Sequence, residues 1–194
     1  MKKIFFLASF VVAMSLNLFA QNDTVYFIDF QESMGSWSID DKVKPESVSF
    51  IWSQTAQYGM KATAYVGGVN NETESWLVSA PLDLTSNTTV SLDFKHARKY
   101  GDNSHLSVQI SKDGTNWTKL EFANWPTGQD WKFIAAGEVD ITSYISTTTQ
   151  IAFVYTSTSS AGATWEVDDV LIKGNGTRIV EPEKPVEHIS LADF

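Results

Sequence analysis

The chain has 194 residues, of which 14 are Lys or Arg and 23 are Asp or Glu, so its formal net charge is −9, and it has no cysteine. An acidic chain without basic clusters is poorly suited to nucleic acids, because phosphate contacts need Lys and Arg. Without cysteine there are no disulfides, so stability must come from a buried core and from any ions that the fold binds.

The first twenty residues predict a secretory signal peptide. Met1, Lys2 and Lys3 form a basic start, residues 4–18 are mostly apolar, and Ala20 is a small residue suited to cleavage. We therefore expect a secreted protein or one at the outer cell surface, without an integral membrane segment after cleavage, since no second apolar stretch of spanning length follows. Cleavage would remove two lysines and no acid, which takes the net charge from −9 to −11.

Short runs of β-branched and aromatic residues follow, separated by turn residues. These runs predict strands near residues 24–30, 36–39, 47–53, 60–66, 76–79, 89–96, 105–111, 117–122, 131–134, 150–156 and 164–173. No window has a sustained helical period, and at most one helical turn is expected near residues 141–145, capped by Asp140. The pattern predicts an antiparallel β-sandwich over residues 21–174. Residues 175–194 are expected to be a charged linker and the start of a further module.

The last predicted strand contains two adjacent acids in an apolar run. Side chains alternate between the faces of a strand, so Asp168 and Asp169 point to opposite sides, and neither side is cleanly polar. A buried carboxylate needs a partner, and the chain has only two arginines, Arg98 and Arg178. A hard cation such as calcium is therefore one candidate partner. The alternative is a carboxylate that is simply solvated at the end of the strand.

Five segments, in the same order, resemble the bacterial cleaved-adhesin and choice-of-anchor J domains, which include gingipain-type adhesin modules related to animal MAM domains. The segments are residues 29–32 with Trp37, 76–84, 92–96, 106–117, and 151–155 with 165–170. The resemblance extends over residues 24–173. It implies an all-β fold, an antiparallel β-sandwich of jelly-roll type, and a non-catalytic, calcium-stabilised binding or adhesion module.

The same resemblance nominates a set of calcium ligands. In such jelly rolls the ion joins the first strand and its turn to the acidic pair on the last strand. Transferred to this chain, the ligands would be Asp29, Glu32, Asp168 and Asp169. Gln31 stands where the family often has an acidic residue. An ion that joins the two ends of the domain would close the longest loop in the chain.

The aromatic residues divide into two predicted groups. Four tryptophans lie in or beside strand patterns and are predicted to be core residues: Trp37, Trp76, Trp117 and Trp165. Three aromatics lie in predicted loops and are nominated as ligand-binding residues: Tyr100, Trp125 and Trp131. Exposed aromatic rings can stack on sugar rings, whereas buried ones would anchor the loops instead.

Other motifs favour structural roles over catalysis. Asp113-Gly114 between two predicted strands is typical of a type I′ hairpin. Asp102 lies in a turn that is either solvated or holds a second calcium. The sequence has no nucleophile elbow, and its three histidines lack metal-ligand spacing, so we predict that the protein is not an enzyme.

The sequence thus leaves two functions open. The first is a binding or adhesion module, stabilised by calcium, whose partner is a glycan or an extracellular protein and not a nucleic acid. The second is a spacer or accessory domain of a larger secreted protein, without a ligand of its own. An exposed aromatic patch at one rim of the sandwich would favour the first, and burial of every tryptophan would favour the second.

Overall fold

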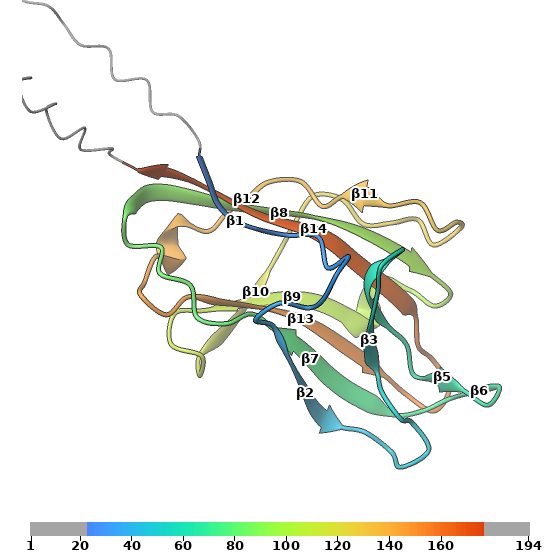
Figure 1. The fold of residues 1–194 in the computed structure, drawn as a ribbon. Coiled ribbons are helices and arrows are strands. Elements are labelled where there is room, and N and C mark those ends of the chain that lie inside the picture. The colour runs from blue at the N-terminus through green and yellow to red at the C-terminus, as the bar shows by residue number, and fades with distance from the viewer. Residues whose placement is uncertain (1–22, 177–194) are drawn as a thin grey trace, which may run out of the picture.

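The computed structural model describes residues 23–176, so the predictions for residues 1–20 and for the tail beyond residue 176 lie outside it. Two antiparallel sheets pack face to face (Figure 1), which confirms the predicted all-β sandwich of jelly-roll type. Within residues 23–176 no helix is long and apolar enough to cross a membrane.

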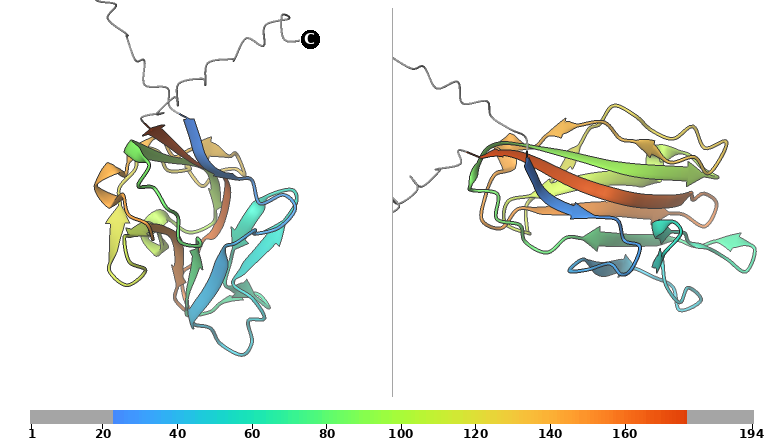
Figure 2. Two further views of the ribbon diagram at one scale, coloured as in Figure 1. Left: turned by 60° about the vertical axis from the view of Figure 1, so that its left-hand side comes forward. Right: turned by 45° about the horizontal axis from the view of Figure 1, so that its top comes forward.

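The first sheet contains seven strands. They are β1 (Asp23–Ile28), β3 (Trp52–Thr55), β4 (Gly59–Ala62), β8 (Asn87–Lys99), β11 (Ile134–Ala135), β12 (Val139–Asp140) and β14 (Thr164–Gly176). Their order is β11-β8-β14-β4-β3, while β1 pairs with β14 and β12 pairs with β8. The long strands β8 and β14 form the centre of this sheet and run side by side along its length (Figure 2).

The second sheet contains five strands, and small elements complete the fold. The five are β2 (Ser38–Val43), β7 (Thr73–Val78), β9 (Leu106–Ser111), β10 (Trp117–Leu120) and β13 (Gln150–Ser157), in the order β10-β9-β13-β7-β2. A two-stranded hairpin consists of β5 (Tyr65–Val66) and β6 (Val69–Asn70), and two short 3-10 turns are η1 (Asn103–His105) and η2 (Thr142–Tyr144). The turn η2 confirms the helical turn predicted near residues 141–145, but its N-cap position is Ile141, which makes no side-chain cap. Asp140, one residue earlier, accepts the backbone N–H of Thr142 at 2.8 Å.

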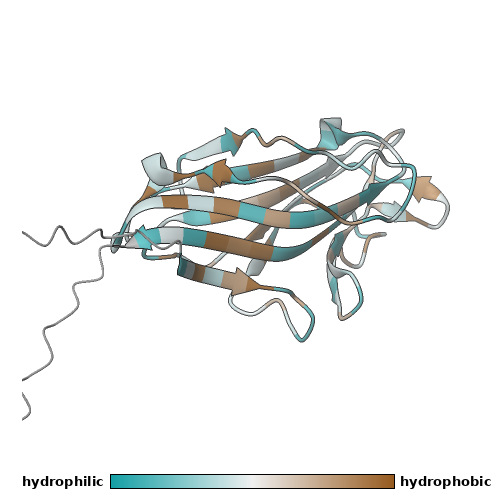
Figure 3. Ribbon diagram, turned by 90° about the horizontal axis from the view of Figure 1, so that it is seen from above, coloured by the Kyte–Doolittle hydropathy of each residue, from teal (hydrophilic) through white to brown (hydrophobic). Residues whose placement is uncertain are grey.

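The core lies between the two sheets and is rich in aromatic side chains. Figure 3 shows hydrophobic and hydrophilic residues alternating along the long strands, as expected when one face of each strand is buried. Phe153 lies at the centre, with ring centroids 5.0 Å from Phe94 and 5.7 Å from both Trp37 and Trp165. Burial of these rings replaces the disulfides that the chain lacks.

The prediction that four tryptophans are core residues is confirmed for Trp37 and Trp165 and wrong for Trp76 and Trp117. In β7 the buried positions alternate with half-buried ones, and Trp76 occupies a half-buried position. It contacts Trp117 edge to face at 5.4 Å. The predicted alternation of buried and exposed residues is present in β7, but Trp76 lies on the outer face of the strand and not on the face that the prediction assigned to it.

Two local predictions need correction. The segment 47–53 is mostly a loop that buries Val48 and Ile51, and β3 begins only at Trp52. The hairpin at Asp113 is present between β9 and β10, but its loop is five residues long rather than the two of a type I′ turn. Asp113 accepts the backbone N–H groups of Thr115 and Asn116, both at 2.8 Å, which opens the turn into a wider loop.

Candidate functional site

The acidic pair lies where β14 changes its pairing partner. Residues 165–167 of β14 pair with β4, whereas the strand pairs with β1 from Val170 onward. Asp168 still pairs with Lys95 of β8, but the register against β8 shifts between Asp168 and Leu171, and Asp169 has a positive φ of 47°. A bulge at such a junction re-aims side chains out of the regular alternation.

The structure brings three of the four nominated calcium ligands near one another. Burial raises the pKa of the Asp168 carboxyl, and the negative charges of Asp169 and Asp29 raise it further. The Asp169 carboxylate also pairs with Lys95 at 2.7 Å. Glu32 is exposed in the loop after β1. In the part of the chain that the structure describes, no three His, Cys, Asp or Glu residues are grouped closely enough to hold a metal ion by themselves.

Backbone carbonyls supply further oxygen atoms beside β1. The carbonyl oxygens of Phe30 and Gln31 converge on the side-chain amide of Gln54, whose nitrogen donates to them at 2.6 and 2.9 Å. Phe30 adopts a positive φ of 54°, which turns the chain so that both carbonyls face this point. The donors next to Asp29 are therefore hard oxygens, which are the ligands that calcium prefers.

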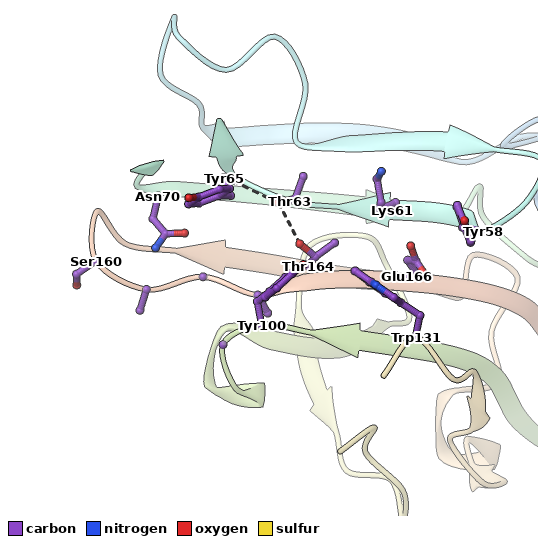
Figure 4. Close-up of a pocket in the computed structure, with 14 residues that line it drawn as sticks. Tyr58, Lys61, Thr63, Tyr65, Asn70, Tyr100, Trp131, Ser160, Thr164 and Glu166 are labelled. Atoms are coloured by element: carbon purple, nitrogen blue, oxygen red, sulfur yellow. Dashed lines mark hydrogen bonds between the residues drawn. The ribbon is translucent and has the colours of Figure 1, made fainter. Parts of the chain in front are cut away.

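A cleft of about 990 Å³ opens on the outer side of the first sheet, where β14 begins (Figure 4). Its walls carry exposed aromatic side chains. Tyr65 comes from the β5–β6 hairpin and is 60% exposed, Tyr100 follows β8 and is 62% exposed, and Trp131 lies in the loop before β11 and is 39% exposed. Tyr100 and Trp131 meet edge to face with ring centroids 6.0 Å apart. Tyr58 also lines the cleft.

The floor of this cleft carries a carboxylate and an amine from neighbouring strands. Glu166 of β14 lies opposite Lys61 of β4, so both side chains lie on the same face of the sheet. Only 3% of Glu166 is exposed, and its Oε2 atom has no hydrogen-bond partner among residues 23–176. Burial raises the pKa of this carboxyl to about 7, although the charge of Lys61 opposes the shift.

Two of the three nominated ligand-binding aromatics, Tyr100 and Trp131, line the cleft, and Trp125 does not. Trp125 packs inward against Phe122, with ring centroids 4.4 Å apart, and lies 6.3 Å from Trp165. It anchors the loop that carries Trp131, which is the alternative role considered for aromatics in loops.

Sequence reasoning missed Glu166, Lys61 and Tyr65 as residues of one site. Glu166 lies far along the chain from Lys61 and Tyr65, and only the β4–β14 register and the fold of the β5–β6 hairpin bring the three together. One signal was available, because Glu166 is a second charged position on the β14 face that it shares with Asp168.

A buried arginine holds the two segments that carry Tyr100 and Trp131. The guanidinium of Arg98 donates to the carbonyl oxygens of Tyr100 and Gly101 and, at 2.9 Å, to that of Pro126. Gly128 covers this group, since a Cβ there would lie 2.7 Å from both terminal guanidinium nitrogens. Arg98 therefore fixes one wall of the cleft before any ligand arrives.

We predict that Arg98→Lys lowers the stability of the protein by about 2 kcal/mol. A lysine lacks the planar fork that reaches several carbonyls at once, and buried carbonyls would lose their donors. Thermal unfolding measures the loss. Lys112→Met, at an exposed lysine, is the matched control and should change nothing. Equal melting temperatures for the two variants would show that the arginine does not hold these loops.

The sheet order and the face-to-face packing define a jelly-roll β-sandwich. More particularly, the chain has the fold of a gingipain-type cleaved adhesin domain. The K3 cleaved adhesin domain of Lys-gingipain from Porphyromonas gingivalis is similar over 79% of this chain and 99% of its own, with 18% identity and a TM-score of 0.54. A second cleaved adhesin domain of Lys-gingipain covers 78% of this chain and 98% of its own, with 17% identity and a TM-score of 0.50.

Carbohydrate-binding modules share the same architecture. A CBM4 structure is similar over 75% of this chain and 99% of its own, with 11% identity and a TM-score of 0.50. No family model matches the sequence, and no curated protein matches it either. At these identities the likeness establishes the fold, and the residues of the cleft must carry the argument about function.

Proposed function

We propose that the protein is a non-catalytic binding module, secreted or displayed at the cell surface, that recognises a carbohydrate in the aromatic cleft. The observation that carries the proposal is the wall made by Tyr100 and Trp131, two exposed rings fixed beside a cleft of about 990 Å³. Sugar rings present apolar C–H faces that stack on such rings, and ligand sites typically have volumes of this order. Adhesin and carbohydrate-binding domains use the same sandwich, which is consistent with this role.

The cleft favours a binding function over a spacer role and over glycoside hydrolysis. A spacer domain has no need of large exposed aromatics at one rim, where they cost solubility. A glycoside hydrolase normally uses two carboxyl groups that flank the scissile bond. Glu166 is the only acid among the described residues that line the cleft, so that pair is missing from the lining.

We further propose that calcium stabilises the junction of β1 and β14. The donor chemistry fits, because the negative charges of Asp29 and Asp169 both repel Asp168, and the carbonyl oxygens of Phe30 and Gln31 lie beside Asp29 in the chain. A bound calcium ion would supply positive charge that offsets this repulsion and would join the first strand to the last. Glu32 would need to move toward the site if it is to bind the ion.

The proposal predicts that the protein binds neutral glycans and that Trp131→Ala weakens the binding by about tenfold, since one aromatic contact contributes up to about 1.5 kcal/mol. A glycan array in buffer with calcium identifies the binders, and isothermal titration measures the loss. Phe50→Ala is the matched control, because Phe50 is 61% exposed and does not line the cleft. Absence of any bound glycan, or equal losses in both variants, would contradict the proposal.

A further inference from the structure

We infer that Glu166 and Lys61 together recognise two adjacent hydroxyl groups of a neutral sugar, and that they make the cleft select neutral sugars over acidic ones. The inference rests on the proposed function, since it names the chemistry of the ligand for the same cleft.

The two head groups are free to serve a ligand. Glu166 and Lys61 are directly opposite across β14 and β4, which places their Cβ atoms about 5 Å apart. Nevertheless, no ion pair joins them in the described part of the chain. Thr63 and Thr164 lie next to them in the lining but bond to each other at 3.3 Å (Figure 4). The hydrogen-bonding capacity of the charged pair is therefore not used within the pair, and the buried Oε2 atom of Glu166 has no partner among residues 23–176.

The unpaired oxygen of Glu166 indicates what the ligand supplies. Its Oε2 atom is buried and has no partner within residues 23–176, and an unsatisfied buried carboxylate is costly. A sugar hydroxyl can donate to this oxygen, while the Lys61 ammonium donates to the oxygen of the neighbouring hydroxyl. In Figure 4 Lys61 and Tyr65 lie on one side of Glu166, and Tyr100 and Trp131 lie on the other. A sugar ring that stacks on Trp131 would therefore have its polar edge within reach of the pair.

The same pair explains selection by charge. The carboxylate of a uronic acid would meet the Glu166 carboxylate in a partly desolvated site, where repulsion is poorly screened. A positively charged amino sugar would meet Lys61. A neutral sugar uses both groups without either penalty.

The test uses methyl glycosides as probes, titrated into the wild-type protein and followed by NMR. The neutral probes are methyl glycosides of glucose, galactose and mannose, and the acidic probe is methyl glucuronide. We expect binding of at least one neutral probe, weaker by tenfold or more for the glucuronide, for Glu166→Gln and for Lys61→Met. Glu121→Gln, at an acid whose side chain is 80% exposed, is the control and should bind as wild type does.

A loss of fold is separated from a loss of ligand contact by the melting temperature. Glu166→Gln removes a buried charge, so at pH 8 the variant should melt at the same temperature as wild type or higher, even though it binds weakly. If no glycoside binds wild type at pH 8, the inference and the proposed function both fail. If binding requires Trp131 but is unchanged by Glu166→Gln, by Lys61→Met or by a carboxylate on the sugar, only the inference is wrong.

Discussion

Calcium is expected to raise the melting temperature of the protein, and EDTA to remove that gain. A ligand that binds only the folded state stabilises it by about 4 kcal/mol at a thousandfold excess over its dissociation constant. For a domain of this size that corresponds to roughly 10 °C. The gain arises because the ion would offset the repulsion among Asp29, Asp168 and Asp169 and join β1 to β14.

The variant Asp168→Asn makes this test specific, because its effect should change sign. Without metal, the neutral side chain relieves the repulsion at the junction and still accepts the backbone N–H of Asp169, so the variant should melt above wild type in EDTA. With calcium, it lacks one anionic ligand and should melt below wild type. Glu46→Gln, at an exposed acid, should follow wild type in both conditions. If EDTA does not change the melting temperature of the wild-type protein, the positive charge of Lys95 alone compensates the negative charges of the acidic pair.

Gly59→Ala is expected to cost at least about 3 kcal/mol of stability, as a strained backbone and a collision with main-chain atoms act together. Gly59 has a φ of +62°, and a Cβ there would lie 2.5 Å from the carbonyl oxygen of Val167 and 3.0 Å from the Asp168 carboxyl carbon. A backbone oxygen inside a sheet cannot move aside cheaply. The alanine would push β14 away at the residue next to the acidic pair.

The hairpin glycine Gly67 provides the control. It also has a φ of +62°, but nothing lies within 4 Å of the position of its Cβ. Gly67→Ala should therefore cost only the conformational penalty of about 1 kcal/mol. Chemical denaturation compares the two variants directly. If both lose the same stability, the close approach of Gly59 to β14 contributes nothing, and the junction is looser than its geometry implies.

The strands could be predicted from sequence because their signal is local. Alternation in β7 and β9 reflects one buried face, whereas β13 is a nearly continuous buried run. The predicted positions of all three strands agree with the structure within a few residues. The two-residue strand β12 was missed because so short a ladder has no period to detect. Trp76 was assigned to the core because a large apolar residue normally fills it, whereas the register of β7 places it on the outer face.

The site was only partly predictable, for a related reason. Asp168 and Asp169 stand out because they interrupt an apolar strand, and Tyr100 and Trp131 because they lie in loops. The partnership of Glu166 with Lys61 depends on which strands pair and in which register, and a single sequence does not contain that information in local form. Nor does it reveal that Arg98 fixes the loop beside Trp131 or that Trp125 turns inward.

The pairing of β1 with the end of β14 has a mechanical consequence. Asp23 lies opposite Gly174, so the described chain enters and leaves at the same end of the sandwich, away from the β5–β6 hairpin (Figure 1). Tension applied through the two ends would load the hydrogen bonds between these strands one after another, from Asp23 inward, rather than all at once. The peeling would then reach the junction at Asp168 and Asp169. A calcium ion bound there would resist the separation of β1 from β14. The force needed to unfold the module would then depend on the surrounding calcium concentration.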